Sequence, residues 1–260
     1  MTDLSRLEVI LRTLRDPGDG CPWDLEQTFR SIVPHTLEEA YEVADAIERD
    51  DYMALPGELG DLLFQVLFYC QLGAEQARFT LADVVDALER KLVERHPHVF
   101  GDAPAATATH VARDWEARKS DARRRAAAGT ASELDDVPRA LPALTRAGKV
   151  QKRAARVGFD WPDTLGARAK LGEELGELDA AHANGVADEL EDELGDVLFA
   201  TVNVARHLGV EPERALRRAT AKFERRFRAV EARLAAAGRR PEEASASELD
   251  DLWEAVKRES

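Results

Sequence analysis

The segment Glu58-Leu59-Gly60-Asp61-Leu62-Leu63-Phe64-Gln65-Val66-Leu67-Phe68-Tyr69 decides the fold of this 260-residue chain. Counted from Leu59, its aliphatic residues fall at i, i+3, i+4, i+7 and i+8, which places them on one face of an α-helix. Similar spacing occurs in four further segments, residues 4–14, 81–93, 194–208 and 215–234, whereas alternating β-branched runs are absent. The sequence therefore predicts an all-α fold built from helical bundles.

Part of this segment occurs twice in the chain. A constant shift of 135 residues places Glu58–Phe64 on Glu193–Phe199. The same shift places Glu38-Glu39-x-x-Glu42 on Glu173-Glu174-x-x-Glu177, so the gap between the two acidic segments is identical in both copies. The sequence therefore predicts an internal duplication.

Looser matches flank the duplicated segments. They pair Gly20-Cys21-Pro22-Trp23-Asp24 with Gly158-Phe159-Asp160-Trp161-Pro162, Lys91-x-x-x-Arg95 with Lys222-x-x-x-Arg226, and Trp115–Lys119 with Trp253–Lys257. Turn signals separate the expected helices, among them Pro56-Gly57 and residues 158–162. These matches extend the duplication over most of the chain.

Two tandem helical-bundle domains account for the length. We place the N-terminal domain at residues 1–123 and the C-terminal domain at 137–260. The linker is expected at 124–136, where alanines, a glycine and small polar residues follow a run of arginines and form the weakest apolar segment of the chain.

The charge balance limits the classes of function. Asp and Glu number 50 against 36 Lys and Arg, which gives a formal net charge of -14. So acidic a surface repels phosphate backbones, and we expect no general nucleic-acid binding. The two cysteines fit neither a disulfide framework nor a zinc motif. No apolar stretch is long enough for a membrane helix and no signal peptide is recognisable, so we expect a cytoplasmic protein without membrane association.

The duplicated acidic segments predict metal sites. Residues three apart share a helix face, so two antiparallel helices would bring four carboxylates together in each copy. Clustered carboxylates repel one another unless a cation neutralises them, and an all-oxygen site favours Mg²⁺, with Mn²⁺ as a substitute. The expected ligands are Glu39, Glu42, Glu58 and Asp61 in the first copy and Glu174, Glu177, Glu193 and Asp196 in the second.

Two other interpretations of the acidic segments were weighed. Carboxylates at this spacing often form a solvated helix face, and Thr36-x-x-Glu39 also fits a helix-capping box. The second copy has Leu171 in place of Thr36 yet keeps Glu174 and Glu177, so a cap cannot explain both copies. The repetition favours the metal site.

Basic and aromatic residues near these segments suggest phosphate and base contacts. Lys222 and Arg226 share a helix face, and beside a metal cluster such a pair can hold a polyphosphate, although alone it would be ordinary surface charge. Trp115 and Trp253 would either stack on a nucleobase or simply pack. No Gly-x-x-x-x-Gly-Lys-Ser/Thr loop is present, so any nucleotide would be held through carboxylate-bound metal.

The pattern Glu-Glu-x-x-Glu followed by Glu-x-x-Asp resembles the signature of the MazG-type nucleoside triphosphate pyrophosphohydrolases. Three further segments, Gly20–Asp24, Glu94–Phe100 and Lys222–Phe227, are similar to parts of the two-domain members. The resemblance implies Mg²⁺-dependent hydrolysis of a nucleoside triphosphate to monophosphate and pyrophosphate by a homodimer of helical bundles. Our leading hypothesis is that both NTPs and dNTPs are accepted.

Carried onto this chain, the resemblance implies the metal ligands given above and a main working site in the C-terminal copy. Water activation would involve Glu173 or Glu38. The substrate-binding residues would be Lys170, Lys222, Arg226 and Trp253, with Lys91, Arg95, Trp115 and Lys119 as counterparts in the first copy. Two alternatives stay open: a dUTP- or dCTP-specific pyrophosphatase of the same fold, and a helical module that senses nucleotides without turnover.

Overall fold

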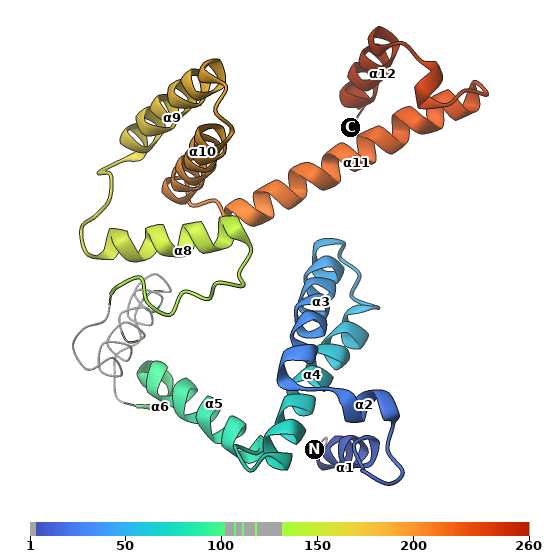
Figure 1. Cartoon of the computed structure of the whole chain (residues 1–260), viewed down its shortest axis with the longest axis vertical. Coiled ribbons are helices and arrows are strands. Elements are labelled where there is room, and N and C mark those ends of the chain that lie inside the picture. Colours follow the sequence, from blue (N-terminus) through green and yellow to red (C-terminus); the bar gives the residue numbers. More distant parts are fainter. Residues whose placement is uncertain (1–3, 102–106, 108–110, 112–117, 119–131, 260) are drawn as a thin grey trace. The chain divides into compact units, whose positions relative to one another are not determined.

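The computed structural model describes residues 4–101, 107, 111, 118 and 132–259. In this part of the chain every regular element is a helix, which confirms the predicted all-α fold. The chain divides into two compact units, residues 1–122 and 123–260 (Figure 1). Most of the expected linker lies outside the described residues, so its bounds stay a prediction. Among the described helices, none combines the length and the apolar character that a bilayer crossing requires.

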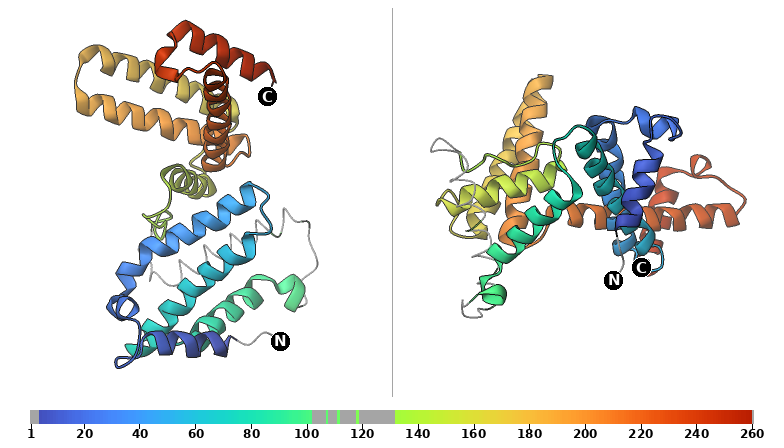
Figure 2. Two further views of the ribbon diagram at one scale, coloured as in Figure 1. Left: turned by 90° about the vertical axis from the view of Figure 1, so that its right-hand side faces the viewer. Right: turned by 90° about the horizontal axis from the view of Figure 1, so that it is seen from below.

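The first unit is organised around a helical hairpin. Its helices are α1 (Ser5–Leu14), α2 (Pro22–Glu26), α3 (Phe29–Glu48), α4 (Leu55–Glu75), α5 (Leu81–Arg95) and α6 (Pro97–Phe100). Helices α3 and α4 lie side by side, joined by a short connection, and α1 packs against α4 (Figures 1 and 2). Five fully buried side chains form the core where α1, α3 and α4 meet: Leu11, Ile32, Leu67, Phe68 and Leu72.

The start of α3 corrects the capping-box interpretation. The cap residue is Thr28, whose Oγ1 accepts the Ser31 N–H at 3.2 Å while Ser31 Oγ accepts the Thr28 N–H at 2.8 Å. Thr36 lies inside the helix, where its hydroxyl bonds to the Ile32 carbonyl at 3.1 Å and to the Tyr69 hydroxyl at 2.8 Å. Glu39 therefore has no capping role.

Pro56, expected in a turn, instead lies in the first turn of α4, where its missing N–H is not needed.

The second unit repeats the hairpin. It contains α8 (Ala143–Arg156), α9 (Thr164–Asn184), α10 (Ala187–His207), α11 (Pro212–Ala236), the short 3₁₀-helix η1 (Pro241–Glu243) and α12 (Ala246–Glu259). Helices α9 and α10 lie side by side in both figures, and α10 also packs on α8. Helix α12 folds back onto α11, with a small core of Val230, Leu234 and Val256 between them. The hairpin positions the acidic segments.

Candidate metal centre

Three carboxylates converge between α9 and α10. Glu174 and Glu177 lie one turn apart on α9, and Glu193 faces them from α10. One oxygen of each residue lies within 4.8 Å of an oxygen of both others. Ionised carboxylates at this spacing raise one another's pKa, and three oxygen donors so arranged suit a hard divalent ion.

Lys170 is the cation beside this cluster. Its Nζ lies 2.7 Å from Glu173 Oε1 and 2.8 Å from Glu174 Oε1. The hydrogen bond from Lys170 lowers the pKa of Glu174, although the burial of that carboxyl opposes the effect. The contact with Glu174 raises the pKa of Glu177, and hydrogen bonds to Glu173 and Glu174 raise the pKa of Lys170. Lys170 therefore stays charged and holds Glu174 ionised.

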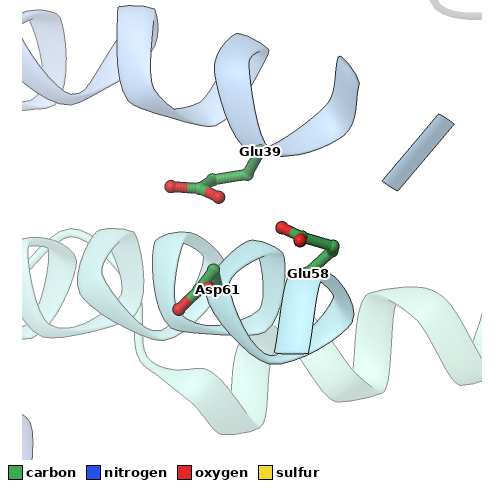
Figure 3. Close-up of side chains that lie close together, drawn as sticks. All are labelled: Glu39, Glu58 and Asp61. Atoms are coloured by element: carbon green, nitrogen blue, oxygen red, sulfur yellow. The ribbon is translucent and has the colours of Figure 1, made fainter. Parts of the chain in front are cut away.

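A matching cluster lies between α3 and α4. Glu39 extends from α3 toward Glu58 and Asp61 on α4 (Figure 3), and one oxygen of each lies within 4.8 Å of the others. Burial, followed by the charges of Glu42 and Asp61, raises the pKa of Glu39. The position of Lys170 is taken by His35, whose Nδ1 lies 3.7 Å from Glu38 and whose ring meets Trp23 edge-on. The two clusters therefore differ in this basic residue and in their third carboxylate, which is Asp61 on α4 in the first unit and Glu177 on α9 in the second.

Two of the eight expected ligands lie just outside these groups of three. Glu42 is close enough to Glu39 to hydrogen-bond with it, and Asp196 is an exposed residue one turn beyond Glu193 on α10. Both lie on the hairpin helices at the predicted spacing. Their coordination of a metal stays a prediction.

The expected phosphate and base contacts of the second copy lie on α11 and α12. Lys222 and Arg226 are one turn apart on α11, on which α12 packs. Trp253 is partly buried, with its ring 5.1 Å from that of Phe223. Trp253 also packs against the small core between α11 and α12. Contacts of all three with a nucleotide stay predictions.

The corresponding residues of the first copy are described only in part. Lys91 and Arg95 lie one turn apart near the end of α5. Trp115 and Lys119 lie outside the described residues.

One polar cluster was not predicted from the sequence. Arg206 on α10 pairs with both carboxylate oxygens of Asp160, and His207 Nε2 lies 3.1 Å from the same carboxylate. The pKa of Asp160 is lowered, mainly by the side-chain hydrogen bond from Arg206. The Gly158–Pro162 segment, which resembles Gly20–Asp24, was the available signal, but Asp24, the acidic residue of that counterpart, lies two positions later in the match than Asp160.

Comparison with known proteins places this geometry in a family. The model of the MazG nucleotide pyrophosphohydrolase domain matches residues 27–100 and 164–230, which contain both acidic clusters. The chain is 51% identical to the nucleoside triphosphate pyrophosphohydrolase of Escherichia coli (strain K12), over 100% of this chain and 98% of that protein. It is 41% identical to a Thermotoga maritima protein named nucleoside triphosphate pyrophosphohydrolase/pyrophosphatase MazG, over 95% of this chain and 93% of that protein.

Proposed function

Because this chain belongs to the MazG family of nucleotide pyrophosphohydrolases and is therefore a hydrolase, we propose that it cleaves nucleoside triphosphates to monophosphate and pyrophosphate at the α9–α10 cluster. The observation that carries the proposal is the convergence of Glu174, Glu177 and Glu193 beside Lys170. The E. coli and T. maritima relatives are both named for this activity.

The donor set fits Mg²⁺. All three converging groups are carboxylates, and Asp196 would join them from the next turn of α10. Mn²⁺ accepts the same ligands. When bound, the metal would neutralise the triphosphate and lower the pKa of a coordinated water near the α-phosphorus. Glu39, Glu42, Glu58 and Asp61 would form the equivalent site of the first unit.

Residues around the cluster would handle the proton and the substrate charge. Lys170 contributes a permanent positive charge near the triphosphate, and the first unit has His35 in the matching position. Glu173 lies beside the cluster and forms an ion pair with the Lys170 ammonium. We assign it the role of proton acceptor, with Glu38 as its counterpart in the first unit. Lys222 and Arg226 would hold phosphates, and Trp253 would contact the base.

A homodimer is part of the proposal. Apolar side chains of α9, α10 and α11 are about half exposed in the single chain, among them Leu175, Leu194, Leu198, Leu216 and Phe223. A second copy would cover such a surface. Broad acceptance of NTPs and dNTPs is also proposed, because the sequence offers no residue that can be identified as reading the base. The cytoplasmic location stays a prediction from the sequence.

The product tests the reaction. The full-length protein is incubated with each of the eight common NTPs and dNTPs and Mg²⁺, and the products are separated. We expect monophosphate and pyrophosphate from several bases, with heavy oxygen from labelled water on the monophosphate. Diphosphate and inorganic phosphate would refute the proposed cleavage, and turnover of dUTP or dCTP alone would replace broad acceptance with the base-specific alternative.

A further inference from the structure

The two helices that carry the acidic cluster of the second unit are joined directly at one end only. Helices α9 and α10 pack side by side as an antiparallel hairpin, and residues 185–186 connect them. At the opposite end, α9 begins at Thr164 and α10 ends at His207, and the chain leads from there to other helices. The relative position of the clustered carboxylates therefore depends on side-chain contacts, including those at this open end.

The buried side chains between α9 and α10 hold the register of the two helices only weakly. Apart from the cluster residue Glu174, the buried residues of these helices are small, namely Ala167, Ala181, Ala200 and Val202. The corresponding hairpin of the first unit buries larger side chains, among them Ile32, Leu67, Phe68 and Leu72. Large side chains interdigitate and resist sliding, whereas alanines offer little to interlock.

The segment that precedes α9 fastens the open end to both helices. Asp160 pairs with Arg206 in the last turn of α10, with Arg206 Nη1 2.9 Å from Asp160 Oδ2. Asp163 caps α9, since its Oδ1 accepts the Gly166 N–H at 3.1 Å. Between them, Trp161 packs so closely on Gly166 that a Cβ atom there would lie 2.9 Å from the indole ring. One short segment thus connects the end of α10 with the start of α9.

The pair of Asp160 with Arg206 has a well-defined geometry. Both Nη atoms of the guanidinium contact the carboxylate, and Arg206 Nε and Nη2 also donate to Asn203 Oδ1 at 3.1 and 2.7 Å. The side chain of Arg206 is 20% exposed and that of Asp160 is 25% exposed. A largely buried, two-point ion pair fixes its two elements more firmly than an exposed single contact.

The first unit closes the same end of its hairpin with a different guanidinium–carboxylate pair. Glu75 is the last residue of α4, and both of its carboxylate oxygens contact Arg15, which also donates to main-chain carbonyls just before α3. The shift of 135 residues places Gln71 at the position of Arg206, and Gln71 Nε2 donates to Glu75 at 2.9 Å. Both copies therefore keep the closure although the paired residues differ, as expected if the closure serves the cluster that both copies carry.

We propose that Asp160 is a positioning residue for the α9–α10 cluster, because its pair with Arg206 holds the carboxylates of α9 opposite Glu193 of α10. None of the contacts described for Asp160 is with a cluster residue, so it acts through the register of the two helices. The proposal rests on the proposed function, in which this cluster binds the metal. A binding site needs its ligands within about 0.5 Å of their places, so a slight shift of register weakens the metal while the fold persists.

The Mg²⁺ requirement of the full-length protein tests the positioning role. The measurement is the free Mg²⁺ concentration that gives half-maximal pyrophosphate release at a fixed NTP concentration. We expect Asp160→Asn and Arg206→Gln each to raise it about tenfold, the lower end of the effect of residues that orient metal ligands. The kcat at saturating Mg²⁺ should change less than about twofold. The double variant should match the single variants, because both break the same pair.

The matched control is Glu75→Gln, which breaks the pair at the open end of the first hairpin and should leave the Mg²⁺ requirement unchanged. Amide hydrogen exchange supplies a readout without turnover. Asp160→Asn should speed exchange in the first two turns of α9 and the last turn of α10, and leave the turns beside residues 185–186 unchanged. Faster exchange with an unchanged Mg²⁺ requirement would make Asp160 a merely structural residue and overturn the proposal, as would unchanged exchange at the open end.

Failure of the proposed function would be distinguishable from failure of the positioning role. If the unmodified protein released no pyrophosphate, the proposed hydrolysis would be refuted, and binding of Mn²⁺ without nucleotide, measured by electron paramagnetic resonance, would test Asp160 alone. We expect Asp160→Asn to raise the Mn²⁺ dissociation constant about tenfold. An equal dissociation constant in the folded variant would overturn the positioning role.

Discussion

At the scale of single residues, Lys170 distinguishes the two acidic clusters most clearly. It lies within 2.8 Å of Glu174, where the first unit has His35. An ammonium so close to a metal ligand competes with the metal for that carboxylate, yet it adds positive charge for a triphosphate. Its effects on metal binding and on turnover should therefore have opposite signs.

Lys170→Met tests this opposition. We expect kcat/KM to fall at least tenfold, about 1.4 kcal/mol of barrier, because a charge near the phosphates is lost. Binding of Mg²⁺ or Mn²⁺ without substrate should become tighter, as calorimetry would show. The matched control is His35→Met, which should change turnover little. Weaker metal binding in Lys170→Met would mean that the lysine organises the cluster and does not compete within it.

At the scale of elements, the ion pair between Arg15 and Glu75 ties α1 to the end of α4. The two side chains meet at 2.7 Å, with Arg15 only 7% exposed, and the side-chain hydrogen bond from Arg15 is the main cause that lowers the pKa of Glu75. A carboxyl whose pKa is lower in the folded state contributes stability above its unfolded value of about 4.5. That contribution disappears as the pH falls through the folded pKa.

Glu75→Gln should reduce the free energy of unfolding at pH 7 by roughly 1–2 kcal/mol, since the pair is partly buried. The difference from the unmodified protein should shrink as the pH falls below 4.5. Urea unfolding at a series of pH values measures it, with Glu89→Gln on the exposed side of α5 as the control. A difference that is constant from pH 7 to pH 3 would assign the effect to packing and not to charge.

The α9–α10 hairpin carries converging negative charge, so a divalent cation should stabilise it. We expect Mg²⁺ in excess of its dissociation constant to raise the unfolding temperature, since a ligand that binds only the folded state stabilises it. EDTA should reverse the shift, and Glu193→Gln should reduce it. If Na⁺ at matched ionic strength raised the unfolding temperature equally, the stabilisation would come from charge screening and not from a bound divalent cation.

Sequence periodicity predicted the helices because the apolar spacing is local. The converging carboxylates also follow from local spacing, once the two helices are assumed to pair. The capping alternative for Thr36 was set aside only because the second copy lacks that threonine; its hydrogen bond to Tyr69, which lies on another helix, could not be predicted. The hydrogen bond from Gln151 Nε2 on α8 to the Phe199 carbonyl on α10 could not be predicted for the same reason, since it depends on how the two helices pack. The hydrophobic periodicity of a sequence does not predict contacts between residues that lie far apart in the chain.

At the scale of the whole molecule, the proposed homodimer accounts for the exposed apolar residues of the second unit. We expect sedimentation to give about twice the chain mass of 28.8 kDa. Leu198→Asp, which places a charge on a half-exposed position of α10, should shift the population toward monomer. The control is Leu208→Asp, an exposed position just beyond α10. A monomer for the unmodified protein at micromolar concentration would remove the dimer from the proposal.

The two units should contribute unequally to turnover. Pyrophosphate release from a nucleoside triphosphate with Mg²⁺ is the measurement that tests the central claim, made on Glu193→Ala and on its matched control Glu58→Ala. Both variants must first give the circular dichroism of the unmodified protein. We predict that Glu193→Ala loses well over tenfold in kcat, and Asp196→Ala likewise, whereas Glu58→Ala and Asp61→Ala keep much of the activity. Equal losses would indicate two working sites, and full activity in Glu193→Ala would contradict the assignment of catalysis to the α9–α10 cluster.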